Sequence, residues 1–184
     1  LHDRVTTAAT SGNDSIEGFD HSADTLAGGL GNDTLRGYSG ADTYLYAAGD
    51  GADWIVERGS QASEIDRLRL NGINASDVTV ARSGRDAILR FTMGGSVTLR
   101  EQFSGWTGDG IDEVVFADGA VWQASELRSR YMAAVVTSGN DSIEGFDDSA
   151  DTLAGGLGND TLHGHAGADT YLYAAGDGTD WIVE

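Results

Sequence analysis

Apolar residues recur at a nearly fixed distance in the first part of the chain, about once in every nine positions. Each segment of 10–57 is rich in glycine and small polar residues, and it ends with an aspartate, a variable residue and an apolar residue. These triplets are Asp14-Ser15-Ile16, Asp24-Thr25-Leu26, Asp33-Thr34-Leu35, Asp42-Thr43-Tyr44 and Asp53-Trp54-Ile55. An amphipathic helix needs an apolar residue every three to four positions, so this spacing excludes one.

We therefore expect each segment to form a turn of about six residues and a strand of about three, whose middle residue points inward. Glycine suits the turns because it adopts positive φ and lets neighbouring backbones approach closely. Successive turns then fall on alternate sides of a flattened coil, so that turn n stacks on turn n+2. The pattern predicts an all-β fold containing parallel β-rolls.

The whole segment 10–57 returns at 137–184, an offset of 127 positions, and 43 of the 48 residues are identical. The second copy carries the corresponding triplets at Asp141, Asp151, Asp160, Asp169 and Asp180. Identity this high indicates a recent tandem duplication of a unit of 127 residues, so that 137–184 is the opening of the next unit. Tandem copies are typical of arrays, stalks and adhesive fibres.

The charge follows the same division. The net charge is −19, with nine acidic residues and one arginine in 10–57, ten acidic residues and no arginine in 137–184, and a nearly neutral 58–136. A chain this acidic is expected to repel nucleic acid and anionic lipid. It has no cysteine for a disulfide and no apolar run long enough to span a membrane, so we expect no membrane insertion.

Stacking the turns brings the aspartates into register and creates an electrostatic problem. Two carboxylates about 4 Å apart repel by roughly 4 kcal/mol at an effective dielectric constant of 20. Several such pairs would exceed the usual stability margin of about 5–15 kcal/mol, and the acidic blocks contain almost no arginine. A divalent cation resolves this, and carboxylate and backbone carbonyl oxygens in flexible turns favour Ca²⁺ over Zn²⁺ or Mg²⁺.

The segment "GGLGNDTLR" at 28–36 resembles the RTX, or haemolysin-type calcium-binding, nonapeptide repeat at every fixed position. "YLYAAGDGADWIVE" resembles the closing segment of an RTX block, and "IDRLRLNGINASDVTVARSGRDAILRF" and "IDEVVFADGAVW" are similar to the domain that often follows. The resemblance implies several calcium ions, each lying between turns n and n+2 and held by the aspartates and the turn carbonyls. It also implies type I secretion and an extracellular or bacterial cell-surface location, where calcium folds the chain.

Applied to the positions of this sequence, the resemblance implies metal ligands along two edges of each roll. The implied ligands are Asp14, Asp33 and Asp53 on one edge, Asp24, Asp42 and Asp66 on the other, then Asp141, Asp160 and Asp180, then Asp151 and Asp169, with the turn glycines Gly28, Gly31, Gly155 and Gly158. Two segments depart from the pattern. "GFDHSADTLA" lacks the central glycine and has an extra residue, which predicts an incomplete site, and Ala9-Thr10 replaces the usual glycine pair of the first turn.

The middle of the chain has a different pattern. We predict that 1–9 ends a preceding linker, that 58–124 forms a small antiparallel β domain, and that 125–136 is a helical linker between the rolls 10–57 and 137–184. Hairpin turns are expected at Ser83–Asp86 and at Asp118-Gly119. Asp112, in "GDGIDEVVF", either binds calcium or lies in a solvated turn.

Three functions are compatible with these features. The first is a repeated structural unit of an adhesin, whose partners are calcium and the neighbouring tandem repeats, and the 127-residue period favours it. The second is the secretion and folding domain of an exported enzyme or toxin, and the third is a module that binds surface glycans. Trp54, Trp106, Trp122 and Trp181 could stack on sugars, although we predict that Trp54 and Trp181 cap the apolar column of each roll.

No catalytic motif accompanies these repeats. The sequence contains no EF-hand loop, no HExxH, no G-x-S-x-G and no P-loop. Paired carboxylates of the glycosidase type are a weaker interpretation than metal binding, because the acids are regularly spaced. We therefore predict that the chain is not an enzyme.

Overall fold

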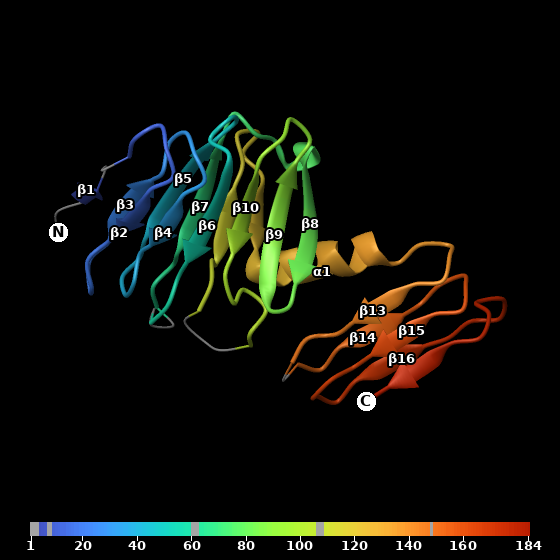
Figure 1. Cartoon of the computed structure of the whole chain (residues 1–184). Coiled ribbons are helices and arrows are strands. Elements are labelled where there is room, and N and C mark those ends of the chain that lie inside the picture. The colour runs from blue at the N-terminus through green and yellow to red at the C-terminus, as the bar shows by residue number, and fades with distance from the viewer. Residues whose placement is uncertain (1–3, 7–8, 60–62, 106–108, 148) are drawn as a thin grey trace.

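The structure is a computed structural model that describes residues 4–6, 9–59, 63–105, 109–147 and 149–184. Its first part is a β-roll of short strands, shown in blue to teal in Figure 1. They are β1 (Arg4–Thr6), β2 (Ser15–Glu17), β3 (Asp24–Ala27), β4 (Thr34–Arg36), β5 (Thr43–Ala47) and β6 (Ala52–Val56). The middle apolar residue of each nonapeptide strand is buried, as the alternation predicts.

Strands two turns apart pair in parallel, which confirms the predicted stacking of turn n on turn n+2. On one sheet, Ile16 of β2 lies beside Leu35 of β4, which lies beside Ile55 of β6. On the other sheet, Leu26 of β3 lies beside Tyr44 of β5. The two columns of apolar side chains face each other inside the roll and form its core.

Both sheets of the first roll continue into the middle of the chain. The middle strands are β7 (Arg67–Asn71), β8 (Val78–Ser83), β9 (Asp86–Phe91), β10 (Ser96–Leu99), β11 (Glu113–Val115) and β12 (Val121–Gln123), with a 3₁₀ turn at Ala75–Asp77. The strand orders are β1-β3-β5-β7-β11-β12 and β2-β4-β6-β10-β9-β8. The β8–β9 and β11–β12 pairs are antiparallel and turn where the sequence predicts hairpins. The boundary between domains at 57/58 stays a prediction.

One helix follows, α1 (Ala124–Val135), and begins one residue before the predicted start. It buries Leu127 and Tyr131 against the middle strands. No helix among the described residues is long and apolar enough to cross a membrane.

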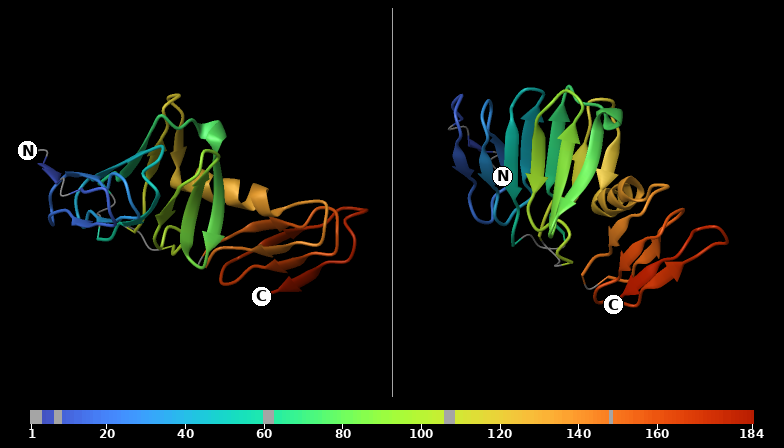
Figure 2. Two further views of the ribbon diagram at one scale, coloured as in Figure 1. Left: turned by 45° about the horizontal axis from the view of Figure 1, so that its top comes forward. Right: turned by 45° about the vertical axis from the view of Figure 1, so that its right-hand side comes forward.

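A second, smaller roll follows the helix, shown in orange and red in Figure 1 and set apart from the first roll in both views of Figure 2. Its strands are β13 (Ser142–Glu144), β14 (Thr152–Ala154), β15 (Thr161–His163), β16 (Thr170–Leu172) and β17 (Trp181–Val183). They pair as β13-β15-β17 and β14-β16. Among the described residues, its fully buried core consists of Ile143, Leu153 and Leu162.

An aromatic side chain joins the second roll to the middle of the chain. The ring of Phe146, 2% exposed, lies 5.0 Å from Phe103 and 6.0 Å from Tyr131. The guanidinium groups of Arg82 and Arg128 lie 5.2 and 4.7 Å from the same ring. Arg82 also donates to the carbonyls of Glu144 and Gly145, so cation–π contacts and hydrogen bonds hold the first turn of this roll.

The predicted role of the tryptophans is wrong. Trp54 is 45% exposed and Trp181 is 71% exposed, so neither caps an apolar column. Side chains alternate between the two faces of a strand, and Ile55 takes the inward position of β6, which leaves Trp54 outside. The guanidinium of Arg100 lies 4.9 Å from the Trp54 ring. Trp106 lies outside the described residues.

Candidate metal sites

The aspartates of the nonapeptides form a hydrogen-bonded ladder along each edge of the first roll. On one edge, Asp33 Oδ1 accepts from the backbone N–H of Asp14 at 2.8 Å, and Asp53 Oδ1 accepts from that of Asp33 at 3.0 Å. Each aspartate comes directly before a strand or within its first two residues, so parallel pairing places the carboxylates in one column. One carboxylate oxygen of Asp33 and one of Asp53 are thus fixed by the preceding turn of the column.

The column of aspartates on the second edge extends beyond the last nonapeptide. Asp42 Oδ1 accepts from the N–H of Asp24 at 2.7 Å, and Asp66 Oδ1 accepts from that of Asp42 at 2.8 Å. Asp66 therefore lies at the position expected for the end of this edge. Asp112 Oδ2 in turn accepts from the N–H of Asp66 at 2.9 Å, so Asp112 extends the ladder into the middle of the chain.

The second roll repeats the pattern. Asp160 Oδ1 accepts from the N–H of Asp141 at 2.8 Å, and Asp180 Oδ1 accepts from that of Asp160 at 3.0 Å. On the other edge, Asp169 Oδ1 accepts from the N–H of Asp151 at 2.9 Å. The structure thus brings all the predicted aspartates into their expected columns, while their role as metal ligands stays a prediction.

The second carboxylate oxygen distinguishes two groups of four among these aspartates. Among the described residues, buried oxygens without a hydrogen-bond partner include the Oδ2 atoms of Asp33, Asp42, Asp160 and Asp169. A buried carboxylate oxygen with no partner is unfavourable, and native structures satisfy such groups. A hard cation such as Ca²⁺ fits these four positions, because it takes carboxylate and carbonyl oxygens in flexible geometry.

The other group satisfies its second oxygen locally. Asp24 Oδ2 accepts from the N–H of Phe19 at 2.6 Å, and Asp14 Oδ2 accepts from the N–H of Thr10 at 2.6 Å. The second roll repeats these two bonds from Phe146 to Asp151 and from Thr137 to Asp141. These are the turns that depart from the nonapeptide pattern, and the expectation of an incomplete site at the turn of Asp24 stays a prediction.

The predicted turn glycines lie against these carboxylates and against stacked backbone. A Cβ on Gly28 or Gly155 would collide with the unpartnered Oδ2 of Asp33 or Asp160. Gly31 has φ +133° and Gly158 has φ +136°, and a Cβ on either would collide with the carbonyl of a glycine two turns earlier. Gly28 and Gly155 thus leave space beside the carboxylate, and Gly31 and Gly158 let the turns stack closely.

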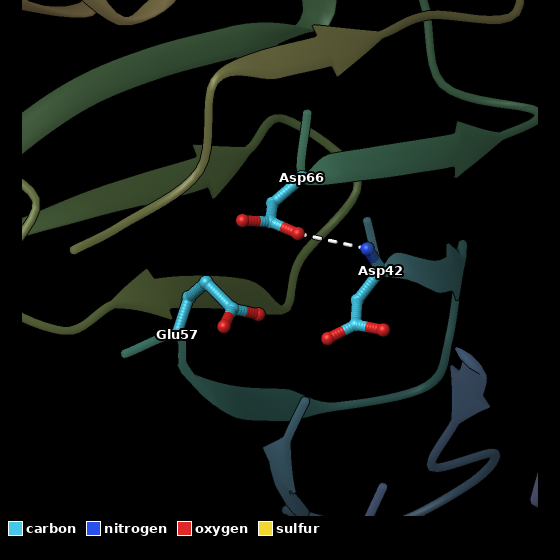
Figure 3. A group of neighbouring side chains, drawn as sticks. All are labelled: Asp42, Glu57 and Asp66. Carbon is cyan, nitrogen blue, oxygen red and sulfur yellow. Dashed lines mark hydrogen bonds between the residues drawn. The ribbon is translucent and has the colours of Figure 1, made fainter. Parts of the chain in front are cut away.

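The sequence interpretation missed Glu57, which follows β6 and lies 1% exposed beside the end of the second edge. Figure 3 shows its carboxylate turned toward those of Asp42 and Asp66, and one oxygen of each lies within 4.8 Å of the others. The Tyr44 hydroxyl and the N–H of Arg58 donate to Glu57. The available signal was an acidic residue at the same place in both copies, Glu57 and Glu184.

Burial raises the pKa of three carboxyl groups at this end of the roll, those of Asp42, Asp53 and Glu57. Burial, with neighbouring carboxylates, raises the pKa of Asp42 and of Asp53 to about 7, although backbone hydrogen bonds oppose the shift. Burial and the nearby Asp66 charge raise the pKa of Glu57 to about 9. The folded chain therefore binds protons that the unfolded chain releases above pH 3.8 to 4.5.

This difference predicts how the stability of the calcium-free chain depends on pH. The contribution from these protons is fully present below the unfolded pKa values, and it is lost as pH rises through about 7 and then about 9. In chelator, the melting temperature should therefore be lower at pH 8 than at pH 5, whereas saturating calcium should remove or reverse the difference. Thermal melts followed by circular dichroism measure this. Equal melting temperatures in chelator at both pH values would contradict it.

Comparison with known families agrees with this geometry. The family profile of the RTX calcium-binding nonapeptide repeat matches residues 22–55 and 147–180. A search of curated proteins finds no significant match. Among solved structures, the chain is similar to the extracellular lipase LipA from Serratia marcescens, at 23% identity and a TM-score of 0.23. That match covers 100% of this chain and 28% of the lipase chain.

Proposed function

Because its two acidic blocks are RTX calcium-binding nonapeptide repeats, we propose that this chain is a non-catalytic structural module of a large, adhesin-like bacterial RTX protein. Its ligand is Ca²⁺, its partners are the neighbouring repeats of the same chain, and its place of action is outside the cell. The observation that carries the proposal is the set of four buried Oδ2 atoms without partners, at Asp33, Asp42, Asp160 and Asp169.

Calcium binding is coupled to folding in this proposal. Without a cation the stacked carboxylates either repel one another or must bind protons, so a chain made where calcium is scarce stays unfolded in these blocks at neutral pH. Export by type I secretion would deliver it to a medium in which extracellular modules bind calcium at about 10⁻⁴–10⁻³ M. Hydrogen exchange of the chain after removal of calcium with a chelator tests this step.

The tandem organisation supports a role as a repeated spacer. The unit of 127 residues is followed by a near-identical block, and that block is docked on the middle of the chain through Phe146. Its counterpart in the first roll, Phe19, lies in the same sequence "IEGF" and is 48% exposed. Docking each roll on the unit before it would convert a string of repeats into a connected rod.

Replacing Phe146 with alanine tests the docking step. The ring is almost fully buried between Phe103 and Tyr131, so its removal should destabilise the docked arrangement by about 3–5 kcal/mol. We expect the second roll to move independently, with a larger maximum dimension in small-angle X-ray scattering of the calcium-loaded chain. Phe19→Ala is the matched control, because the same substitution in the first roll should leave the scattering unchanged. Identical scattering from Phe146→Ala and the unmodified chain would argue against a docked rod.

A further inference from the structure

Glu57 occupies a position in the first roll that glycine occupies at the two preceding levels of the same sheet. In the sheet β2-β4-β6, Glu17 pairs with Arg36 and Arg36 pairs with Val56. The residues that follow these three are Gly18, Gly37 and Glu57, so they form one stack on the second edge of the roll. The stack therefore changes at its third level from a residue without a side chain to a carboxylate.

The space beside each glycine shows what this change does. A Cβ on Gly18 would lie 2.7 Å from Asp24 Oδ2 and 2.9 Å from the backbone carbonyl oxygen of Gly37. A Cβ on Gly37 would instead collide with Asp42 Oδ2, the Tyr44 hydroxyl and Glu57 Oε2. Beside Gly37, the carboxylate of Glu57 thus takes the place that the carbonyl of Gly37 takes beside Gly18. Asp42 Oδ2, the Tyr44 hydroxyl and Glu57 Oε2 surround one small space.

The buried carboxyl groups around this space favour a bound cation. Asp42 and Asp66 are fully buried and Glu57 is 1% exposed, so the three carboxyl groups lie together away from water. Asp42 Oδ2 points into the space and has no hydrogen-bond partner. A buried cluster of three carboxylates is strongly unfavourable without a positive charge or bound protons.

We propose that Asp42, Glu57 and Asp66 form a calcium site that closes the first roll, with Glu57 as a ligand from outside the nonapeptides. The inference rests on the proposed function, since it assumes that the roll binds calcium. The family match ends at residue 55, so neither Glu57 nor Asp66 belongs to the matched repeats. Three carboxylates and a hydroxyl are hard oxygen donors, which suit Ca²⁺. The site lies where the ladder passes from Asp42 of the roll to Asp66 and Asp112 of the middle of the chain. Its ion would therefore bind ligands from both the roll and the middle of the chain.

Counting the calcium ions bound at equilibrium by the full chain tests the site. Glu57→Gln keeps the size of the side chain and its ability to accept a hydrogen bond from Tyr44 but removes the charge, so the variant should bind one ion fewer per chain. Asp33→Asn, which changes a nonapeptide carboxylate, should also bind one ion fewer. Glu17→Gln is the matched control on the same sheet, where the side chain is 55% exposed, and it should bind as many ions as the unmodified chain.

The outcomes separate this inference from the proposed function. If Glu57→Gln binds as many ions as the unmodified chain with unchanged affinity while Asp33→Asn loses one, the closing site is refuted and the calcium-binding role stands. No calcium uptake by the unmodified chain refutes both. If Glu57→Gln does not fold, crystals of the unmodified chain in calcium decide: an ion about 2.3–2.6 Å from Glu57 Oε2 supports the site, and an ion held without Glu57 overturns it.

Discussion

Chelation of calcium should unfold the second roll before the first. The fully buried core of the second roll consists, among the described residues, of Ile143, Leu153 and Leu162, whereas the first roll shares one continuous core with the middle of the chain. Both rolls contain stacked carboxylates that repel when the cation is removed. The same electrostatic penalty therefore acts against a much smaller hydrophobic stabilisation in the second roll.

Hydrogen exchange measured residue by residue in chelator tests this order. The amides of β13 and β15 should lose their protection completely, while those of β7, β9 and β10 keep theirs, and the nonapeptide strands β2 and β4 should lie between these limits. Calcium should restore protection in both rolls, and magnesium at the same concentration serves as the control. Equal protection of β15 and β4 in chelator would show that the extended core does not support the first roll.

The second large effect is expected from a single added methyl group at Gly31. The residue has φ +133°, and its Cβ would lie 2.6 Å from the carbonyl carbon of Gly12 and closer still to the oxygen. Alanine there combines backbone strain with overlap against a stacked turn, so Gly31→Ala should lower the free energy of unfolding by about 2–5 kcal/mol.

Gly49→Ala is the matched control for this substitution. Gly49 also has positive φ, +100°, but a Cβ there would meet nothing within 4 Å, so only the backbone strain of about 1–2 kcal/mol applies. Denaturant unfolding of both variants in saturating calcium measures the difference. If both substitutions have the same effect, close stacking of the turns is not what requires glycine at Gly31.

The sequence alone predicts the rolls well because their information is local. One apolar residue per nonapeptide, such as Leu35, and one aspartate, such as Asp33, define the inward position and the edge of each turn. Once turn n stacks on turn n+2, the columns of carboxylates follow without any long-range information. The departures from the pattern were equally informative, since Asp14 and Asp24, which lie in those turns, accept hydrogen bonds on both carboxylate oxygens within their own turns.

What the sequence did not predict depends on contacts between distant segments. The motif around Asp112 made it a candidate calcium ligand, but its partner in the ladder is Asp66, 46 residues earlier, and no local spacing indicates that contact. Glu57 was interpreted as the end of a block, and only the register of β4 and β6 shows that it stands in a stack of glycines. Trp54 was predicted to cap the apolar column of the roll, but the strand alternation around Ile55 places it outside.

The most direct test of the central claim is far-UV circular dichroism of this chain during a calcium titration, with magnesium as the control. The account predicts a cooperative gain of β signal at about 10⁻⁴–10⁻³ M Ca²⁺ that magnesium does not produce. A spectrum that shows complete β structure in excess chelator and does not change when calcium is added would contradict calcium-driven folding of the rolls.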